Sequence, residues 1–203
     1  MILFPVSSAV GETTDIDDLI EREIVIKKTF YSKRNSDLPF SGKVTGQQQG
    51  EMKDGKKDGL WKFFRDGKLV YEENYRMGVL HGPGKTYFSD GRIKITWEYE
   101  DGKRTGRRMM YFENGKLELE ENYKNDLLHG VRIGFYENGQ LQEKGNYKEY
   151  RLHGPWVGYY DNGQLYSEGN YINGKKDGPW VSYRKNGKLM DKGIYKDDKK
   201  ISD

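Results

Sequence analysis

The feature that most constrains the fold of this chain is a repeat, in which the same residue types return at every 24th position through most of the sequence. A tyrosine recurs at this step six times, as does a glycine that always follows Asp or Asn. The tyrosines are Tyr75, Tyr99, Tyr123, Tyr147, Tyr171 and Tyr195, and the glycines are Gly67, Gly91, Gly115, Gly139, Gly163 and Gly187. A second glycine series runs from Gly82 to Gly178, with Gly59 one residue out of phase. Series locked in step over six copies identify a repeat protein.

Each repeat unit predicts a β-hairpin. An aromatic run leads to the Asp/Asn-Gly pair, an alternating run follows, and a glycine-containing link closes the unit. Asp/Asn-Gly between two such runs is a strong hairpin signal, and the unit is too short for a helix pair with its connections. One hairpin cannot bury an apolar face alone, so successive hairpins must pair. We therefore expect an all-β fold, an elongated antiparallel meander of about six 24-residue hairpins with an N-terminal cap.

The length of the hairpin loop decides which side chains share a face of the sheet. A two-residue loop, Asn162-Gly163, would send Tyr159 and Leu165 to opposite faces, whereas a three-residue loop, Asp161-Asn162-Gly163, makes them partners. We choose the three-residue loop, with Gly163 in the left-handed conformation. It predicts one apolar face made of Val157, Tyr159, Leu165, Gly169 and Tyr171, of Ile93, Ile95, Trp97 and Tyr99, and of Leu117, Leu119 and Tyr123. Gly169 is expected to relieve crowding beside the large rings.

The chain divides into four segments: residues 1–12, 13–50, 51–196 and 197–203. Residues 1–12 are an apolar lead-in, for which the remnant of a signal peptide and an ordinary lead-in both stay open, and with them cytoplasmic and exported localisation. Residues 13–50 form the cap, in which Asp15 precedes a helical turn over Ile16–Ile20 and Glu23–Tyr31 forms a strand. Pro39-Phe40 opens the next strand, residues 51–196 hold the hairpins, and residues 197–203 are a frayed tail. No stretch is apolar enough for a membrane span.

Composition and motifs give no support to an enzyme. One third of the residues are charged, but the net charge is only +3 with both signs interspersed, so nucleic acid is not an expected partner. No nucleophile elbow or phosphate-binding loop occurs, and the sequence offers no cofactor motif. The histidines, His81, His129 and His153, all stand in Leu-His-Gly links, where a polar residue that bonds turn backbone is expected rather than a metal ligand.

The candidate binding site is a row of aromatic residues that also recurs at every 24th position, with basic residues such as Arg92, Lys94, Arg108, Arg132 and Lys144 nearby. Exposed on the second face, such a row would suit a protein-binding surface; covered, it would form a second minor core. The row consists of Phe64, Phe88, Phe112, Tyr136 and Tyr160, and Arg184 continues it. Basic residues of the links predict either contact with anionic lipid or a solvated edge that prevents edge pairing. These are Lys53, Lys56, Lys57, Lys103, Arg104, Lys175 and Lys176.

The stretch GPWVGYYDNGQLYSEGNY, followed by INGKKDG, is similar to the bacterial variant of the MORN (membrane occupation and recognition nexus) repeat. The N-terminal DLIER and FYSKRNSDLPFSGKV resemble the lead-in of family members often labelled YwqK-type antitoxin components. The resemblance covers about residues 18–196, with departures near the tryptophan position at Lys85, Met109 and Arg132. It implies hairpin repeats and binding of a partner protein.

These observations together predict a non-enzymatic scaffold for protein–protein interaction, antitoxin-like by resemblance, with an unidentified protein as its partner. The alternative is a module that binds the membrane surface, through anionic lipid, or a cell-envelope glycan. End-to-end self-association is also expected to be open to the chain, since terminal strands present unpaired edges.

Overall fold

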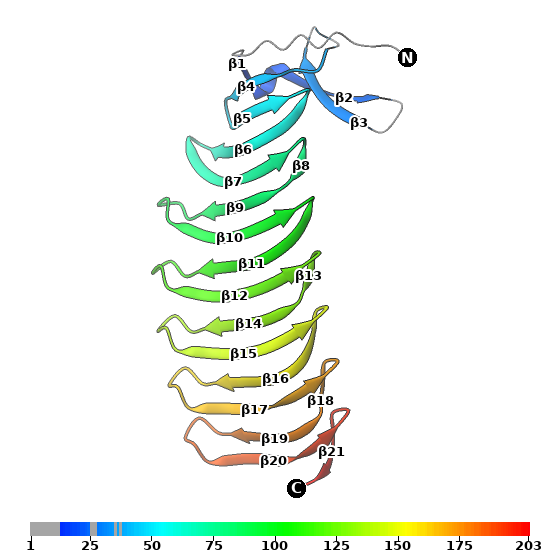
Figure 1. Ribbon diagram of the computed structural model, residues 1–203. Coiled ribbons are helices and arrows are strands. Elements are labelled where there is room, and N and C mark those ends of the chain that lie inside the picture. Colours follow the sequence, from blue (N-terminus) through cyan, green and yellow to red (C-terminus); the bar gives the residue numbers. More distant parts are fainter. Residues whose placement is uncertain (1–12, 25–27, 35, 37) are drawn as a thin grey trace. The chain divides into compact units, whose positions relative to one another are not determined.

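The computed structural model describes residues 13–24, 28–34, 36 and 38–203 (Figure 1), so the predicted lead-in lies outside the described residues. The described part is all-β, as predicted, with one 3-10 helix. None of its residues forms a helix long and apolar enough to cross a membrane. The chain folds into two units. The first comprises the described residues up to Arg92 with Tyr99–Gly102, and the second comprises Ile93–Glu98 and Lys103–Asp203.

The first unit holds the cap and the first hairpins. Its elements are β1 (Thr13–Asp15), η1 (Ile16–Asp18), β2 (Leu19–Ile24), β3 (Lys28–Lys33), β4 (Gly42–Thr45), β5 (Gln48–Lys53), β6 (Lys56–Arg65), β7 (Lys68–Arg76), β8 (Val79–Leu80) and β9 (Gly82–Tyr87). Strands β4 to β7 pair in succession and antiparallel, β7 also pairs with β8 and β9, and β1 pairs with β4 in parallel. Strand β10 (Ile93–Glu100) belongs partly to each unit.

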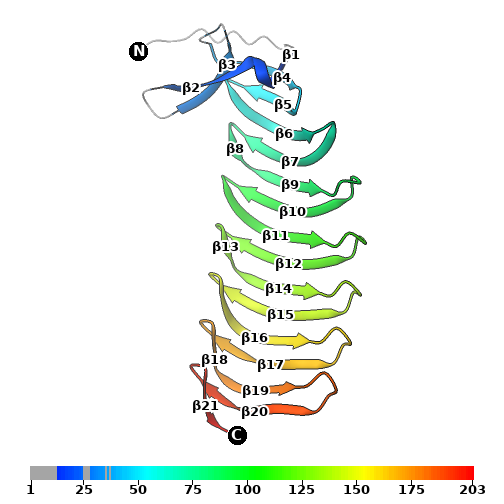
Figure 2. The same cartoon turned by 180° about the vertical axis from the view of Figure 1, so that it is seen from behind.

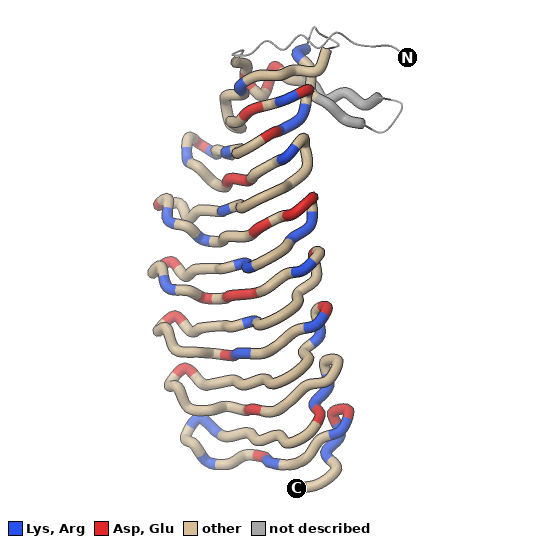
Figure 3. The backbone as a smooth tube through the Cα atoms, viewed as in Figure 1, with Lys and Arg blue, Asp and Glu red and all other residues tan. Residues whose placement is uncertain are grey.

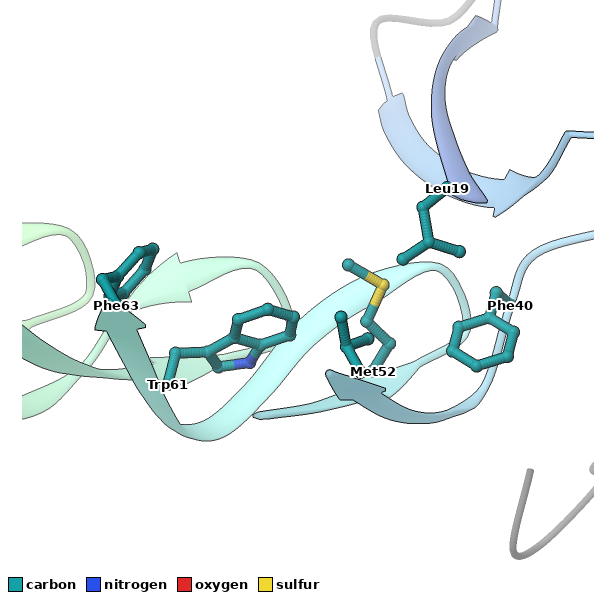
Figure 4. Packing of buried hydrophobic residues seen from close by; sticks show 6 residues of the cluster. Leu19, Phe40, Met52, Trp61 and Phe63 are labelled. Carbon is teal, nitrogen blue, oxygen red and sulfur yellow. The ribbon is translucent and has the colours of Figure 1, made fainter. Parts of the chain in front are cut away.

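The cap confirms one local prediction and corrects another. Asp15 caps the helical turn, because its carboxylate accepts a hydrogen bond from the Asp17 backbone N–H at 3.1 Å. The turn ends at Asp18 rather than at Ile20, since β2 begins at Leu19. The single strand predicted over Glu23–Tyr31 is wrong: β2 and β3 form an antiparallel hairpin there. The next strand, predicted to open at Pro39-Phe40, begins at Gly42. Figure 4 shows the core that joins this cap to the first hairpin. Its buried residues are Leu19, Phe40, Val44, Met52, Trp61 and Phe63.

The second unit is a series of antiparallel hairpins. Its remaining strands are β11 (Lys103–Tyr111), β12 (Leu117–Lys124), β13 (Leu127–Leu128), β14 (Gly130–Phe135), β15 (Leu141–Lys148), β16 (Arg151–Tyr159), β17 (Leu165–Ile172), β18 (Lys175–Lys176), β19 (Gly178–Tyr183), β20 (Leu189–Lys196) and β21 (Lys199–Ser202). Each hairpin pairs with the next. Within this unit the hairpin loops lie along one edge of the sheet and the links along the other, as Figures 1 and 2 both show.

The three-residue hairpin loop is confirmed in the second unit. Tyr159 pairs with Leu165, and the Tyr160 N–H donates to the Gln164 carbonyl at 2.8 Å. The Gly163 N–H closes the turn on the Tyr160 carbonyl at 2.9 Å, with Gly163 at φ +82°. Only glycine adopts this left-handed conformation without strain, which explains why it recurs at this position.

The predicted apolar face is wrong because each hairpin contains an additional bulge. Tyr159 pairs with Leu165 but Gly158 pairs with Ser167, so Tyr166 has no partner and the alternation of faces shifts beyond it. Trp156, rather than Val157, therefore shares a face with Gly169 and Tyr171. The same shift separates Leu117, which pairs with Tyr111, from Leu119, which pairs with Met110.

The first hairpin has a shorter turn, which accounts for the phase slip of Gly59. Arg65 pairs with Lys68 across a two-residue turn, Asp66-Gly67, with φ angles of +51° and +73°. This turn has one residue fewer than the later loops, so each repeat position before it is displaced by one residue from the 24-residue step. Phe64 pairs with Leu69 and thus occupies the place of Tyr159, not that of Tyr160.

The tail is ordered rather than frayed. Strand β21 pairs with β20, with Tyr195 opposite Lys200. The aliphatic part of Lys200 lies over Gly193, where an added Cβ would overlap it. The Lys200 ammonium contacts the carboxylates of Asp191 and Asp203, each at 2.8 Å. The last hairpin is therefore covered by a side chain from the segment predicted to be loose.

Candidate interaction surface

One face of the second unit carries tryptophans packed over glycines; we call it the tryptophan face. An added Cβ at Gly145 would lie 2.7 Å from the Trp156 ring, and one at Gly169 would overlap the Trp180 ring. The two indoles stack with ring centroids 5.9 Å apart, and the Tyr171 ring packs edge-on against Trp180 at 4.9 Å. The predicted role of Gly169 in relieving crowding is confirmed. The rings of this face therefore pack against each other and against the glycines, which stabilises the sheet.

In the middle of the same face, charged residues replace the tryptophan–glycine pairs. Arg108 and Arg132 stand at the tryptophan position, and Glu121 stands at the glycine position between them. Glu121 is 8% exposed and accepts hydrogen bonds from Arg108 at 2.8 Å and Arg132 at 3.3 Å, and Arg132 also pairs with Glu143. The expectation that Arg108 and Arg132 share a face with Lys144 is therefore wrong. Their charge is neutralised within the sheet.

The predicted aromatic row lies next to the hairpin loops, and its residues are half-buried. The Tyr136 hydroxyl donates to the Tyr159 carbonyl at 2.8 Å, and the Tyr160 hydroxyl donates to the Tyr183 carbonyl at 3.0 Å. These bonds tie each loop to the next hairpin. Phe88 and Phe112 occupy the same position in their loops as these tyrosines, because their backbone N–H groups make the same loop hydrogen bond. Phe64 does not, since it pairs with Leu69. Binding of a partner by this row stays a prediction.

The opposite face of the second unit, which we call the valine face, carries an open groove of about 750 Å³. Its apolar lining includes Val157, Val181, Pro155, Pro179 and Ile194, and the neighbouring strand positions Trp156 and Trp180 also line it. One row of cross-strand partners runs through it, in which apolar and charged residues alternate and the charges alternate in sign. In order the row is Met109, Glu120, Ile133, Lys144, Val157, Glu168, Val181 and Lys192. Cross-strand partners share a face, so this row is a single continuous strip.

Three charges of this row are free in the structure. Lys144, Glu168 and Lys192 are exposed, and none has an ion pair with another described residue. Glu120 differs, because it lies 3.6 Å from Arg107. Sequence reasoning missed this strip, since the bulge at Tyr166 had to be known before these residues could be assigned to one face. The signal was present as a charge of alternating sign at every 24th position.

Acidic residues accompany the basic residues of the links. Lysines, arginines and acids are interspersed along them (Figure 3), and Lys196–Asp177 at 2.7 Å, Lys175–Asp197 at 3.7 Å and Arg104–Asp126 at 3.8 Å are ion pairs. Lys57 covers the core instead, with its ammonium 4.5 Å from the centre of the Trp61 ring, and burial lowers its pKa. Of the seven basic link residues of the prediction, Arg104 and Lys175 are in these ion pairs, and the choice between a solvated edge and contact with anionic lipid stays a prediction.

The histidines of the links behave as turn residues. The Nδ1 atoms of His81 and His153 accept hydrogen bonds from the backbone N–H groups of Asp101 and Asn173, each at 3.4 Å. Within the described ranges, no group of three or more His, Cys, Asp or Glu is placed to hold a metal ion.

Comparison with known proteins agrees with the hairpin repeat. The model of the MORN repeat variant family matches residues 57–77, 104–125, 128–149, 152–173 and 176–197, together more than half of the chain. A comparison with curated proteins gave no match. Among solved structures the chain is similar to one in a "Crystal structure of GtfA/B complex bound to UDP and GlcNAc", with 11% identity and a TM-score of 0.26. That match covers 65% of this chain and 24% of the other, and a TM-score this low supports no functional argument. The five matched repeats coincide with the paired hairpins described above, and the chain belongs to the MORN repeat variant family.

Proposed function

We propose that this chain is a non-enzymatic scaffold that binds a partner protein on the valine face, in the antitoxin-like manner that its sequence resemblance implies. The observation that carries the proposal is the groove of about 750 Å³, which combines half-buried valines and exposed prolines with charges that have no partner among the described residues. Protein interfaces combine an apolar centre with charged groups that fix orientation. The tryptophan face lacks this combination because its rings and charges already contact each other.

The repeat supplies the rigidity that such a surface needs. In the loops, Asn114, Asn138 and Asn162 donate side-chain hydrogen bonds to backbone carbonyls of the next loop, at 3.2, 2.7 and 3.2 Å. Strand ladders hold the rest of each hairpin. A partner would therefore meet a backbone fixed in position, and little backbone ordering entropy would oppose binding.

The decisive experiment compares two variants that each add one carboxylate to the second unit. Val181→Asp places it in the groove, whereas Ile172→Asp places it at an exposed position at the end of β17, outside the groove. Tagged wild-type and variant chains are used to capture proteins from lysate of the source cells, and circular dichroism checks that both variants fold. We expect Val181→Asp to lose the captured partner and Ile172→Asp to retain it.

Retention of the partner by Val181→Asp would refute binding on the valine face. The predicted aromatic row would then be tested by Phe88→Ser. Binding of vesicles that contain anionic lipid, without any captured protein, would favour the membrane-surface alternative.

A further inference from the structure

The charged strip of the valine face is self-complementary. Read from Glu120 to Lys192, its charges run negative, positive, negative, positive. A two-fold axis that crosses the strip, parallel to the strands, reverses it, and the reversed strip runs positive, negative, positive, negative. An axis through Val157 would place Lys144 of one copy opposite Glu168 of the other and Glu120 opposite Lys192. Ile133 and Val181, the apolar residues between these charges, would also face each other.

The spacing of the strip favours a second copy over other proteins. Successive charges lie two strands apart, which is about 10 Å at the usual strand spacing. A second copy has the same step by construction, so all charges can stay opposed along the whole strip. Val157 has Lys144 as its cross-strand partner on one side and Glu168 on the other. An axis at Val157 therefore lies at the centre of the four charges.

Other two-fold registers are less favourable. An axis at Lys144 or at Glu168 would oppose like charges, which costs binding energy. An axis at Ile133 or Val181 would form only two opposite-charge pairs. The axis at Val157 forms four: Lys144 with Glu168 twice, and Lys192 twice with Glu120, which also contacts Arg107 of its own chain. The strip thus specifies one register as well as one partner.

We propose that two copies of this chain associate face to face through the valine face, about a two-fold axis at Val157. This inference rests on the proposed function, in that it uses the same face and names a second copy as its occupant. It differs from end-to-end association, because the contact is made by side chains of the sheet face rather than by a strand edge. The contact is isologous, so each charge pair occurs twice.

The test uses charge reversal of the two residues without ion pairs that flank Val157. The mass of the full chain is measured by light scattering over a range of concentrations at low salt, for wild type, Lys144→Glu and Glu168→Lys. We expect wild type to dimerise, and each single variant to weaken dimerisation at least about tenfold, because like charges then oppose each other twice. Lys188→Glu, at an exposed loop position outside the strip, is the matched control and should dimerise as wild type does.

Mixing gives the sharper result. Lys144→Glu presents two carboxylates beside Val157 and Glu168→Lys presents two ammonium groups, so an equimolar mixture should form a heterodimer although neither variant dimerises well alone. The double variant K144E/E168K should recover dimerisation. A wild-type chain that stays monomeric, or a dimer unaffected by these variants, would overturn the proposal. The proposed function would survive that result if Val181→Asp still lost its captured partner, so the two failures can be told apart.

Discussion

The packing of tryptophan over glycine leads to a quantitative prediction at Gly50 and Trp61 in the first unit. A Cβ at Gly50 would lie 2.6 Å from the Trp61 ring, well inside van der Waals contact. Trp61 is fully buried, and its Nε1–H donates to the Glu51 carbonyl at 3.0 Å, so the ring cannot move away. We expect Gly50→Ala to lower the free energy of unfolding by about 1–3 kcal/mol, the usual cost of overpacking.

The effects of changing Gly50 and Trp61 should be coupled. Trp61→Ala alone should cost about 3–5 kcal/mol, as for other buried aromatic residues. Without the ring, the extra methyl group has room, so Gly50→Ala/Trp61→Ala should be close in stability to Trp61→Ala. The expected coupling is therefore about 1–3 kcal/mol, measured as a double-mutant cycle in urea by circular dichroism.

A matched control separates crowding from backbone strain. Gly67 has φ +73° and no atom near its missing Cβ, so Gly67→Ala should cost about 1 kcal/mol through its backbone alone. Its effect should add to that of Trp61→Ala. If the Gly50 and Trp61 changes also add, within about 0.5 kcal/mol, then the ring does not restrict Gly50 and the packing argument is refuted.

Three further predictions concern the first unit. Met77 occupies the left-handed region at φ +49°, where asparagine is better tolerated, so Met77→Asn should raise the free energy of unfolding by about 0.5–1 kcal/mol in urea denaturation. The buried Thr86 hydroxyl has no hydrogen-bond partner among the described residues, so Thr86→Val should stabilise by about 1 kcal/mol in the same assay, and a loss of stability would contradict this. Burial and a hydrogen bond to Glu72 raise the pKa of Tyr87 to about 12, and burial raises the pKa of Tyr75 as well. Above pH 10 the folded state therefore retains protons that the unfolded state loses. Stability should fall as the pH rises from about 10 to about 12, and absorbance of ionised tyrosine should appear together with unfolding.

Some departures from the repeat pattern are explained only by the packing of neighbouring strands. Arg132 at the tryptophan position looked like drift in the repeat. In the structure Glu121 replaces the glycine beside it, so a charged pair has replaced a ring over a glycine. The two residues lie on the neighbouring strands β12 and β14, and their contact shows only in the structure.

The repeat, the hairpin and its loop were determined by the sequence alone, because each depends on local chemistry. Asp/Asn followed by glycine selects a turn with a left-handed residue, and its recurrence at every 24th position fixes the unit. The helical turn capped by Asp15 is local in the same sense.

Only the tertiary structure decided which side chains share a face. The bulge at Tyr166 and the short turn at Asp66-Gly67 each shift the register by one residue, and a shift of one residue exchanges the faces. No local signal marks Tyr166 as the unpaired residue, because its neighbours Leu165 and Ser167 obtain their partners from β16. The order of the tail has the same cause: β21 is stabilised by β20 and by the contact of Lys200 with Gly193 and Asp191. The tryptophan face and the alternating charges of the valine face follow from pairing between strands, which no single repeat contains.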